Sequence, residues 1–339
     1  MFNKLQVLLN DINKISKKEK KNRAFIISNT SDKKTKKYLT PLRKSLNCVY
    51  GGAVVYDDLT TKKICQLIKN KIDYLFIDTE KKASLKNGVI NIERTVRENI
   101  SPEKIFYFKA NDLTVDAASS LLELLFHDDI RNVANKKILI IGAGNIGFKL
   151  ALKLIERGVK VFLNGKRKME TDSFISTINK IKPAATMNKV KHLHKIKDNL
   201  NKFDVIINVS NGNSKILKNK EIFLKKGVIF LEIGRNLFSN ETLNYFLNIG
   251  IIILRLDVSS SFNELIEKKI NTKNELKKIK FSRSKKNGFN LISRGLLGLK
   301  GDIIVDDSTN PKIIYGRINK VRNLDNISWK DKKKIINQK

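Results

Sequence analysis

The sequence is poor in the residues that build disulfide frameworks and metal centres. Its 339 residues include only two cysteines and three histidines. Cys48 and Cys65 are isolated in the chain, so both are expected to be small buried apolar residues. His127 stands alone, while His192 and His194 alternate along a predicted strand, so no two have the helical spacing of a metal pair. We expect half-exposed histidines and no bound metal.

Long apolar runs are also missing. No uninterrupted apolar stretch approaches the roughly 20 residues that a membrane-spanning helix needs, and residues 1–6 lack the layout of a signal peptide. Hydrophobic residues nevertheless make up 41% of the chain, which is typical of a globular protein. We therefore expect a cytoplasmic protein without a membrane partner, and its length is sufficient for two domains with separate cores.

Acidic residues are half as frequent as basic ones, and the formal net charge is +35. Such a charge ordinarily indicates a nucleic acid or an anionic membrane as partner. Here the excess is spread along the whole chain as lysine, and no RNP motif, zinc-finger spacing or basic heptad accompanies it. We expect weak, salt-sensitive binding to polyanions and no specific nucleic-acid partner.

The most informative segment is residues 137–147, Lys-Ile-Leu-Ile-Ile-Gly-Ala-Gly-Asn-Ile-Gly, in which an apolar strand enters a glycine loop and then a helical pattern. Gly142 permits the tight turn, Gly144 lets the backbone approach a pyrophosphate, and Gly147 lets the helix pack on its strand. This order predicts a Rossmann dinucleotide site; the alternative is a Rossmann unit that holds no nucleotide. The candidate cofactor-binding residues of the loop are Gly142, Ala143, Gly144, Asn145, Ile146 and Gly147.

The next strand ends in residues 164–168, Asn-Gly-Lys-Arg-Lys. An acidic residue at this place bonds the ribose 2′-hydroxyl of NAD, whereas a basic group accommodates the 2′-phosphate of NADP. Asn164, Lys166 and Arg167 therefore favour NADP as the cofactor. NAD stays the alternative, because lysine is abundant everywhere in this chain and a basic loop is often only a solvated one.

Strands alternate with helical patterns on both sides of this segment, which predicts parallel sheets and an α/β fold. An N-terminal α/β substrate domain (1–115) is expected to lead through a connecting helix (116–134) to a doubly wound Rossmann domain (135–258) and a mixed helical and hairpin extension (259–339). The predicted strands are 24–27, 49–56, 74–78, 104–108, 137–141, 159–163, 189–193, 204–209, 228–233 and 251–256; the predicted helices include 1–21, 60–69 and 262–280, and Asn287-Gly288 predicts a hairpin turn.

Two later strand ends carry polar or glycine residues, Ser210 and Gly234. Ligands of open α/β sheets bind beyond the carboxyl ends of the strands at the topological switch point, so both residues are expected to face the nicotinamide half of the cofactor. The alternative is that each belongs to an ordinary turn.

In this order of motifs the chain resembles the shikimate-dehydrogenase-like and methylene-tetrahydrofolate-dehydrogenase-like group of two-domain enzymes, over about residues 105–258. The resemblance rests on residues 114–125 (Thr-Val-Asp-Ala-Ala-Ser-Ser-Leu-Leu-Glu-Leu-Leu), on the glycine loop, on 164–167, and on the strands at 203–210 and 227–236. It implies that a cofactor and a small polar substrate bind between two α/β domains. The usual Ser-x-Ser clamp and Asn-Val-Thr-x-Pro-x-Lys loop are missing, so shikimate itself is not the expected substrate.

Hydride transfer to a carbonyl needs a neighbouring proton donor, and a lysine with a carboxylate partner can serve. Lys82, in the segment that most resembles the family's catalytic loop, and Asp116 are the candidate catalytic residues. The alternative for Lys82 is a surface lysine, and for Asp116 the N-cap of the connecting helix.

Together these features predict an NADP-dependent oxidoreductase that acts on a small polar metabolite. Two alternatives stay open. One is a nucleotide-sensing or partner-binding subunit with little or no turnover. The other is an enzyme with tightly held nicotinamide, since Asn287-Gly288 and the glycine-marked residues after it resemble the tail of adenosylhomocysteine-hydrolase-like proteins. The N-terminal helix is compatible with a homodimer, and equally with a helix that covers its own domain.

Overall fold

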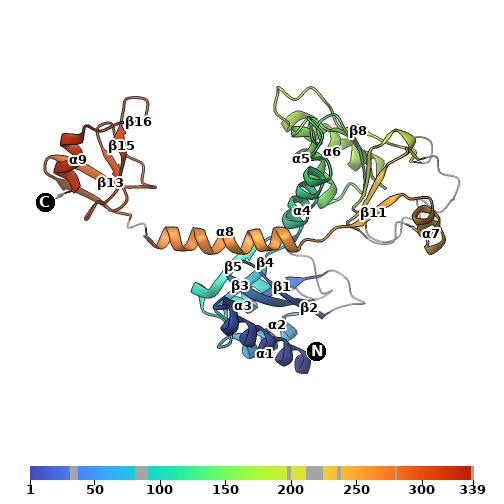
Figure 1. The fold of residues 1–339 in the computed structure, drawn as a ribbon, viewed down its shortest axis with the longest axis horizontal. Helices are drawn as coiled ribbons and strands as arrows, with labels where there is room; N and C mark the ends of the chain where they lie inside the picture. The colour runs from blue at the N-terminus through green and yellow to red at the C-terminus, as the bar shows by residue number, and fades with distance from the viewer. Residues whose placement is uncertain are drawn as a thin grey trace. The chain divides into compact units, whose positions relative to one another are not determined.

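The computed structural model describes residues 1–30, 37–80, 91–196, 200–210, 224–234, 238–278 and 281–336 (Figure 1). They form two compact units, Met1–Leu265 and Ile266–Lys339. The first unit contains two sheets and the second unit contains a third. The domain boundaries expected from the sequence stay a prediction.

The first sheet has the strand order β2-β3-β1-β4-β5, with β2 antiparallel to β3 and the other neighbours parallel. Its strands are β1 (Asn22–Asn29), β2 (Tyr38–Lys44), β3 (Cys48–Val55), β4 (Tyr74–Asp78) and β5 (Ile105–Phe108). Every residue of β3 is buried, as expected of a parallel strand covered on both faces. The four predicted strands of this region are confirmed, whereas β2 was not anticipated.

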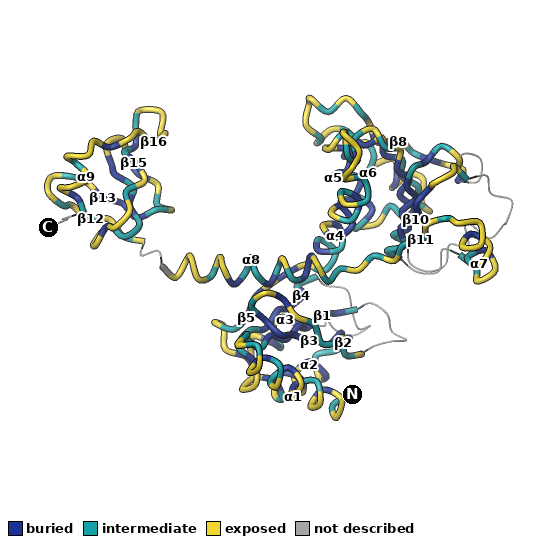
Figure 2. Tube along the Cα trace, viewed as in Figure 1, coloured by how far each residue is buried: buried dark blue, intermediate teal, exposed yellow. Residues whose placement is uncertain are grey.

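Helices cover one face of this sheet: α1 (Phe2–Glu19), α2 (Asp58–Ile68) and the short α3 (Ile92–Arg97). Leu5 and Leu9 of α1 belong to the same buried cluster as the strand residues Phe25 and Leu75. Figure 2 shows the contrast between the buried strands of this sheet and the largely exposed outer side of α1. The predicted helices at 1–21 and 60–69 are thus confirmed. The 3₁₀ turn η1 (Pro102–Lys104) leads into β5.

The opposite face of the first sheet is aromatic and receives the start of α8 (Ser259–Lys278). The Phe262 ring lies 5.1 Å from that of Phe108 and 5.8 Å from that of Tyr50, centroid to centroid. The Tyr50 hydroxyl also donates a hydrogen bond of 2.7 Å to Asn263 Oδ1. Residues more than 200 positions apart in the chain thereby complete one core.

The connecting helix α4 (Ala110–Leu125) begins six residues before Asp116. The predicted capping role of Asp116 is therefore wrong, because the backbone is already helical there and the N-cap position is Lys109. On the buried side of α4, Val115, Ala118 and Leu122 join the core of the second sheet. The helix thus follows the first sheet in sequence and packs with the second.

The second sheet is parallel throughout, with the order β11-β10-β9-β6-β7-β8. Its strands are β6 (Lys137–Ile141), β7 (Lys160–Asn164), β8 (Lys191–His192), β9 (Val205–Asn208), β10 (Ile229–Glu232) and β11 (Ile252–Arg255). The chain winds outward from β6 to β8, returns to β9 beside β6, and winds outward again. This is the doubly wound Rossmann arrangement, so the predicted fold class is confirmed, and the switch point lies between β6 and β9.

Helices lie on both faces of the second sheet: α4, α5 (Asn145–Glu156) and α6 (Lys168–Ile181) pack on one face, and α7 (Asn240–Asn248) on the other. The connection η2 (Leu200–Lys202) precedes β9. Leu139, Ile206 and Phe230 point to the α7 side, while the neighbouring strand residues point to α5. The middle residues of β6, β9 and β10 are therefore apolar on both faces of the sheet, as the sequence suggests.

The second unit holds a small mixed sheet of order β12-β13-β14-β15-β16, together with α9 (Trp329–Ile336). Its strands are β12 (Arg283–Lys286), β13 (Phe289–Ser293), β14 (Ile303–Val305), β15 (Ile314–Ile318) and β16 (Leu324–Asp325). The predicted hairpin is confirmed: Asn287 and Gly288 both have positive φ, 50° and 83°, between the antiparallel strands β12 and β13.

Across the residues that the structure describes, no helix combines the length and the apolar character needed to cross a membrane.

Candidate functional site

The glycine loop joins β6 to α5 at the switch point of the second sheet. Gly142 has φ +117°, which side chains rarely adopt, and its N–H donates a 2.8 Å hydrogen bond to the carbonyl of Asn164. A Cβ on Gly147 would collide with the carbonyl oxygen of Gly142. The backbone therefore requires glycine at two of the three positions. Gly142 has a φ that side chains rarely adopt, and at Gly147 the helix packs too closely on the loop to leave room for a Cβ.

Gly144 is different, because no described heavy atom lies within 4 Å of the place where its Cβ would be. Gly144, the N-cap of α5, and Asn145, its first residue, are both exposed. Within the described part of the chain, no side chain caps this end of the helix, and its first turn carries no acidic residue. The N–H groups and the positive end of the helix dipole are thus left uncapped by every described side chain, and an uncapped helix N-terminus has the chemistry that binds a pyrophosphate.

The predicted 2′-phosphate clamp lies at the neighbouring strand end. Asn164 ends β7, and its amide donates a hydrogen bond of 2.7 Å to the carbonyl of Leu193. Lys166 and Arg167 are exposed, and Arg167 makes an ion pair of 2.7 Å with Glu170 on the first turn of α6. Asn164 therefore holds the strand ends together, while the two cations face solvent beside a second helix N-terminus.

Ser210 and Gly234 follow β9 and β10 at the same edge of the sheet. A Cβ on Gly234 would collide with the carbonyl oxygen of Ser210, and one on Gly142 would come 3.0 Å from the Ser210 nitrogen. The structure thus brings these two residues together with the glycine loop. Asn208, at the end of β9, is fully buried and bonds Ser210 through its oxygen, while its amide nitrogen has no hydrogen-bond partner among the described atoms. Sequence reasoning missed Asn208, although a polar residue inside an apolar strand was a usable signal.

In the first sheet, two carboxylates at or just after the end of β4 accept hydrogen bonds from the start of α4. Asp78, at the end of β4, is almost fully buried and accepts a 3.3 Å hydrogen bond from the N–H of Ala110. Glu80 accepts one of 3.0 Å from the N–H of Asn111. These two side chains occupy the first N–H groups of α4, although both come from residues about 30 positions earlier in the chain. Lys82 lies outside the described residues.

Asp116 projects from α4 toward α5, where its carboxylate makes an ion pair of 2.5 Å with Lys153. Similar pairs join Asp112 to Lys149 and Glu123 to Arg157. The three pairs form a ladder between the two helices, which sequence reasoning did not anticipate. Asp116 is therefore engaged in helix packing, and the proposed pairing with Lys82 stays a prediction.

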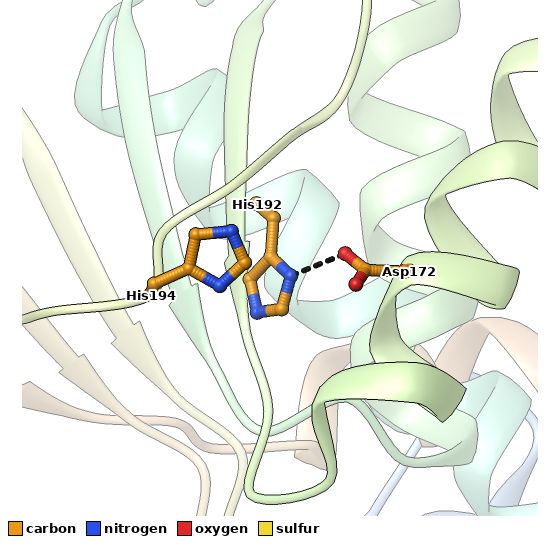
Figure 3. Close-up of side chains that lie close together, drawn as sticks. All are labelled: Asp172, His192 and His194. Carbon is orange, nitrogen blue, oxygen red and sulfur yellow. Dashed lines mark hydrogen bonds and ion pairs between the residues drawn. The ribbon is translucent and has the colours of Figure 1, made fainter.

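A second cluster lies away from the glycine loop. His192, on β8, and His194 have ring centroids 3.8 Å apart, and His192 Nδ1 is 2.5 Å from Asp172 Oδ1 on α6 (Figure 3). The pKa of Asp172 is lowered by this hydrogen bond. From the sequence, the two histidines were expected to be separate, half-exposed residues, because they lack the spacing that pairs metal ligands on a helix. Their separation by two residues in an extended segment places both rings on the same side.

Comparison with known proteins locates the clearest similarity in the second sheet. Residues 125–231 match the family model described as shikimate / quinate 5-dehydrogenase. This match confirms the resemblance to shikimate-dehydrogenase-like, NAD(P)-binding Rossmann proteins for a segment that includes β6, the glycine loop, α5, β7 and β9.

Two curated relatives are glutamyl-tRNA reductases. The one from Thermosipho melanesiensis is 23% identical over 193 residues, which are 56% of this chain and 48% of the relative. The one from Methanococcus maripaludis is 26% identical over 162 residues, 48% of this chain and 40% of the relative. The chain thus spans less than half the length of either relative. Among solved structures, L-tryptophan dehydrogenase from Nostoc punctiforme aligns at 17% identity over 64% of this chain and 60% of that one, with a TM-score of 0.41.

Proposed function

We propose that this protein is an NADP-dependent oxidoreductase that transfers a hydride to or from a small polar metabolite. The observation that carries the proposal is the N-terminus of α5: no described side chain caps it, and no described heavy atom lies within 4 Å of where a Cβ of Gly144 would be. The residues present fit a dinucleotide, because a Cβ at Gly144 would occupy the space that a pyrophosphate needs. The family match over residues 125–231 supports the same reading.

In this proposal each part of the second sheet's carboxyl edge has a separate task. The N–H groups at the start of α5 hold the pyrophosphate, and Lys166 and Arg167 hold the 2′-phosphate, with Arg167 exchanging Glu170 for the phosphate. Ser210 and Gly234 border the nicotinamide half, and the amide nitrogen of Asn208 offers a donor beneath them. When bound, the nicotinamide supplies or accepts the hydride.

Lys82 is proposed as the proton donor on the substrate side. For Asp116 to assist it, its carboxylate would have to leave Lys153. This requirement favours, as a second candidate function, a nucleotide-binding subunit that senses NADP without turnover. The two functions share the cofactor site and differ in whether NADPH is consumed.

The test is a calorimetric titration with NADPH and NADH. Calorimetry is preferred to intrinsic fluorescence because Trp329, the chain's only tryptophan, belongs to the second unit. We expect NADPH to bind more tightly than NADH, and Lys166→Glu/Arg167→Glu to weaken NADPH about 10- to 100-fold, since a hydrogen bond to a charged group contributes about 1.5–3 kcal/mol.

The matched control is Lys62→Glu/Lys63→Glu, which makes the same change of net charge at two exposed positions of α2. It should leave NADPH affinity nearly unchanged. Binding of neither dinucleotide would overturn the proposed function. If NADPH binds, a screen of carbonyl metabolites for NADPH oxidation separates the oxidoreductase from the sensing subunit.

A further inference from the structure

Asp172, His192 and His194 offer one possible ligand atom each, and these three atoms all lie within 4.8 Å of one another (Figure 3). Asp172 comes from the start of α6, His192 from β8, and His194 from the segment just after that strand. Bonds from zinc to imidazole nitrogen or carboxylate oxygen are about 2.0–2.2 Å long. Small rotations of the side chains therefore suffice to place all three atoms around one ion.

The backbone holds the three residues in place. Leu193, between the histidines, is buried; its N–H donates to the carbonyl of Leu163 at 3.0 Å, and its own carbonyl accepts from Asn164. Because Leu193 points into the core, its two neighbours point the other way. The helix is tied to the same segment by Asn179, whose side chain accepts from the N–H of Val190 at 2.9 Å and donates to its carbonyl at 3.0 Å.

We propose that Asp172, His192 and His194 form a binding site for a divalent transition-metal ion of the zinc class. Two imidazoles and one carboxylate suit zinc, copper, nickel or iron, whereas magnesium and calcium prefer oxygen ligands alone. Three protein ligands leave one position of a tetrahedral ion for water or a small anion. The proposal is independent of the proposed function, since no residue of the glycine loop takes part.

Exposure and charge set how such an ion would reach the site. The side chain of His192 is only 8% exposed, whereas Asp172 is about half exposed and His194 lies at the surface. A metal ion could therefore enter from the solvent side, past His194 and Asp172, and would have the largely buried His192 as its inner ligand. The Asp172–His192 hydrogen bond is the competing arrangement, and Lys168 lies near enough to act electrostatically on Asp172. We therefore expect weaker binding than at a site with four protein ligands.

The test uses untagged full-length protein, stripped with a chelator and titrated with Co²⁺ by visible absorption and with Zn²⁺ by calorimetry. We expect about one ion per chain and the intense visible bands of a tetrahedral Co²⁺ site. Zn²⁺ should also raise the melting temperature, because it binds the folded state and cross-links α6 to β8. His194→Ala and Asp172→Ala should abolish the Co²⁺ bands and the rise in melting temperature.

His127→Ala is the matched control, because His127 also pairs with an aspartate, Asp128, at 3.0 Å but has no second histidine beside it. It should bind both ions as the unmodified protein does. His194→Cys should retain Zn²⁺, since a thiolate is also a zinc ligand. Undiminished Co²⁺ binding by His194→Ala, equal loss in His127→Ala, or no Zn²⁺ binding by the unmodified protein would each overturn the proposal. His192→Ala should also lose the Co²⁺ bands. If that variant fails to fold because His192 is largely buried, His194→Ala, which changes an exposed side chain, still tests the proposal.

Discussion

The N-termini of α4 and α5 follow strands of the first and second sheet, and the chain treats them in opposite ways. At α4, Asp78 and Glu80 accept hydrogen bonds from the first backbone N–H groups. At α5, no described side chain caps the helix, and the residue at the N-cap is Gly144. Both ends carry the same partial positive charge. One is neutralised by the protein's own carboxylates, and the other is not capped by any described side chain.

The two helix ends therefore have different roles: the end of α4 contributes to stability, and the end of α5 is the one that the proposed function assigns to the dinucleotide. A helix end capped by the protein's own carboxylates fixes the junction between two elements, but it repels a phosphate. An uncapped end with an exposed glycine contributes less to stability and leaves donors available. Changes at the two ends should therefore separate stability from dinucleotide affinity.

The largest effect is expected for Gly147→Ala. Its Cβ would collide with the Gly142 carbonyl, so α5 must move away from the loop. We expect the free energy of unfolding to fall by about 1–3 kcal/mol, as for other overpacked sites, and NADPH binding to be lost. Urea unfolding and calorimetry measure the two quantities. Unchanged stability would mean that the loop relaxes more freely than its contacts suggest.

Gly144→Asp should act in opposite directions on stability and binding. Its side chain enters open space at a residue with φ −87° and ψ −165°, a conformation suited to an N-cap aspartate. The free energy of unfolding should rise by a few tenths to about 1 kcal/mol, while NADPH affinity falls more than about tenfold because two anions compete for one site.

Gly144→Asn is the control for charge in that experiment. It supplies a similar cap without the negative charge, so it should match the aspartate in stability and lose less affinity. Equal NADPH affinities of Gly144→Asp and Gly144→Asn would argue that the size of the added side chain, and not its charge, prevents binding.

At the other helix, Glu80→Ala removes the acceptor of the Asn111 N–H. We expect the free energy of unfolding to fall by about 1 kcal/mol, the usual loss for a capping residue, with NADPH affinity unchanged within about twofold. Chemical unfolding and calorimetry provide the test. A large loss of NADPH affinity would show that the two helix ends are not independent.

The smallest effect concerns pH and the opposite, amino edge of the second sheet. Burial alone would raise the pKa of Asp204, but hydrogen bonds from the Lys137 N–H and from the Lys225 side chain outweigh it and lower the pKa. A lowered pKa in the folded state stabilises the protein above the unfolded pKa of about 3.9. This contribution is lost as the pH falls through the folded value.

Asp204→Asn should therefore flatten the decline in unfolding free energy below about pH 4, as measured by urea unfolding at several pH values. In the first sheet, the pKa of Asp73 is lowered in the same way: burial raises it, and Arg23 lowers it further than burial raises it. Asp73→Asn is thus the parallel variant. An identical acid profile for Asp204→Asn and the unmodified protein would contradict this account.

The sequence predicted correctly those features that depend only on residues a few positions apart. The glycine loop, the apolar strands beside it and the Asn287-Gly288 hairpin were all predicted, because turn geometry and strand burial depend on neighbouring residues. The edge strand β2 was missed, since it contains Pro41 and pairs irregularly with β3. Proline is tolerated at a sheet edge, but only the fold reveals which segment is the edge.

The start of α4 was misplaced for a related reason. Residues 110–115, Ala-Asn-Asp-Leu-Thr-Val, include several poor helix formers, so the pattern favoured a start at Asp116. In the structure, Asp78 and Glu80 stabilise the earlier start from about 30 residues away. Distant side chains can override local helix propensity, because a capped N–H no longer needs water.

By itself, the sequence determined the alternation of strands and helices, the α/β fold class and the position of the glycine loop, because each follows from patterns within a few residues. Only the tertiary structure decided which helix end is capped and which is open, and that Asp116 pairs with Lys153. It also brought Asp172 beside His192 and His194. The physical reason is that hydrogen bonds and ion pairs act over a few ångströms in space, whatever the separation along the chain.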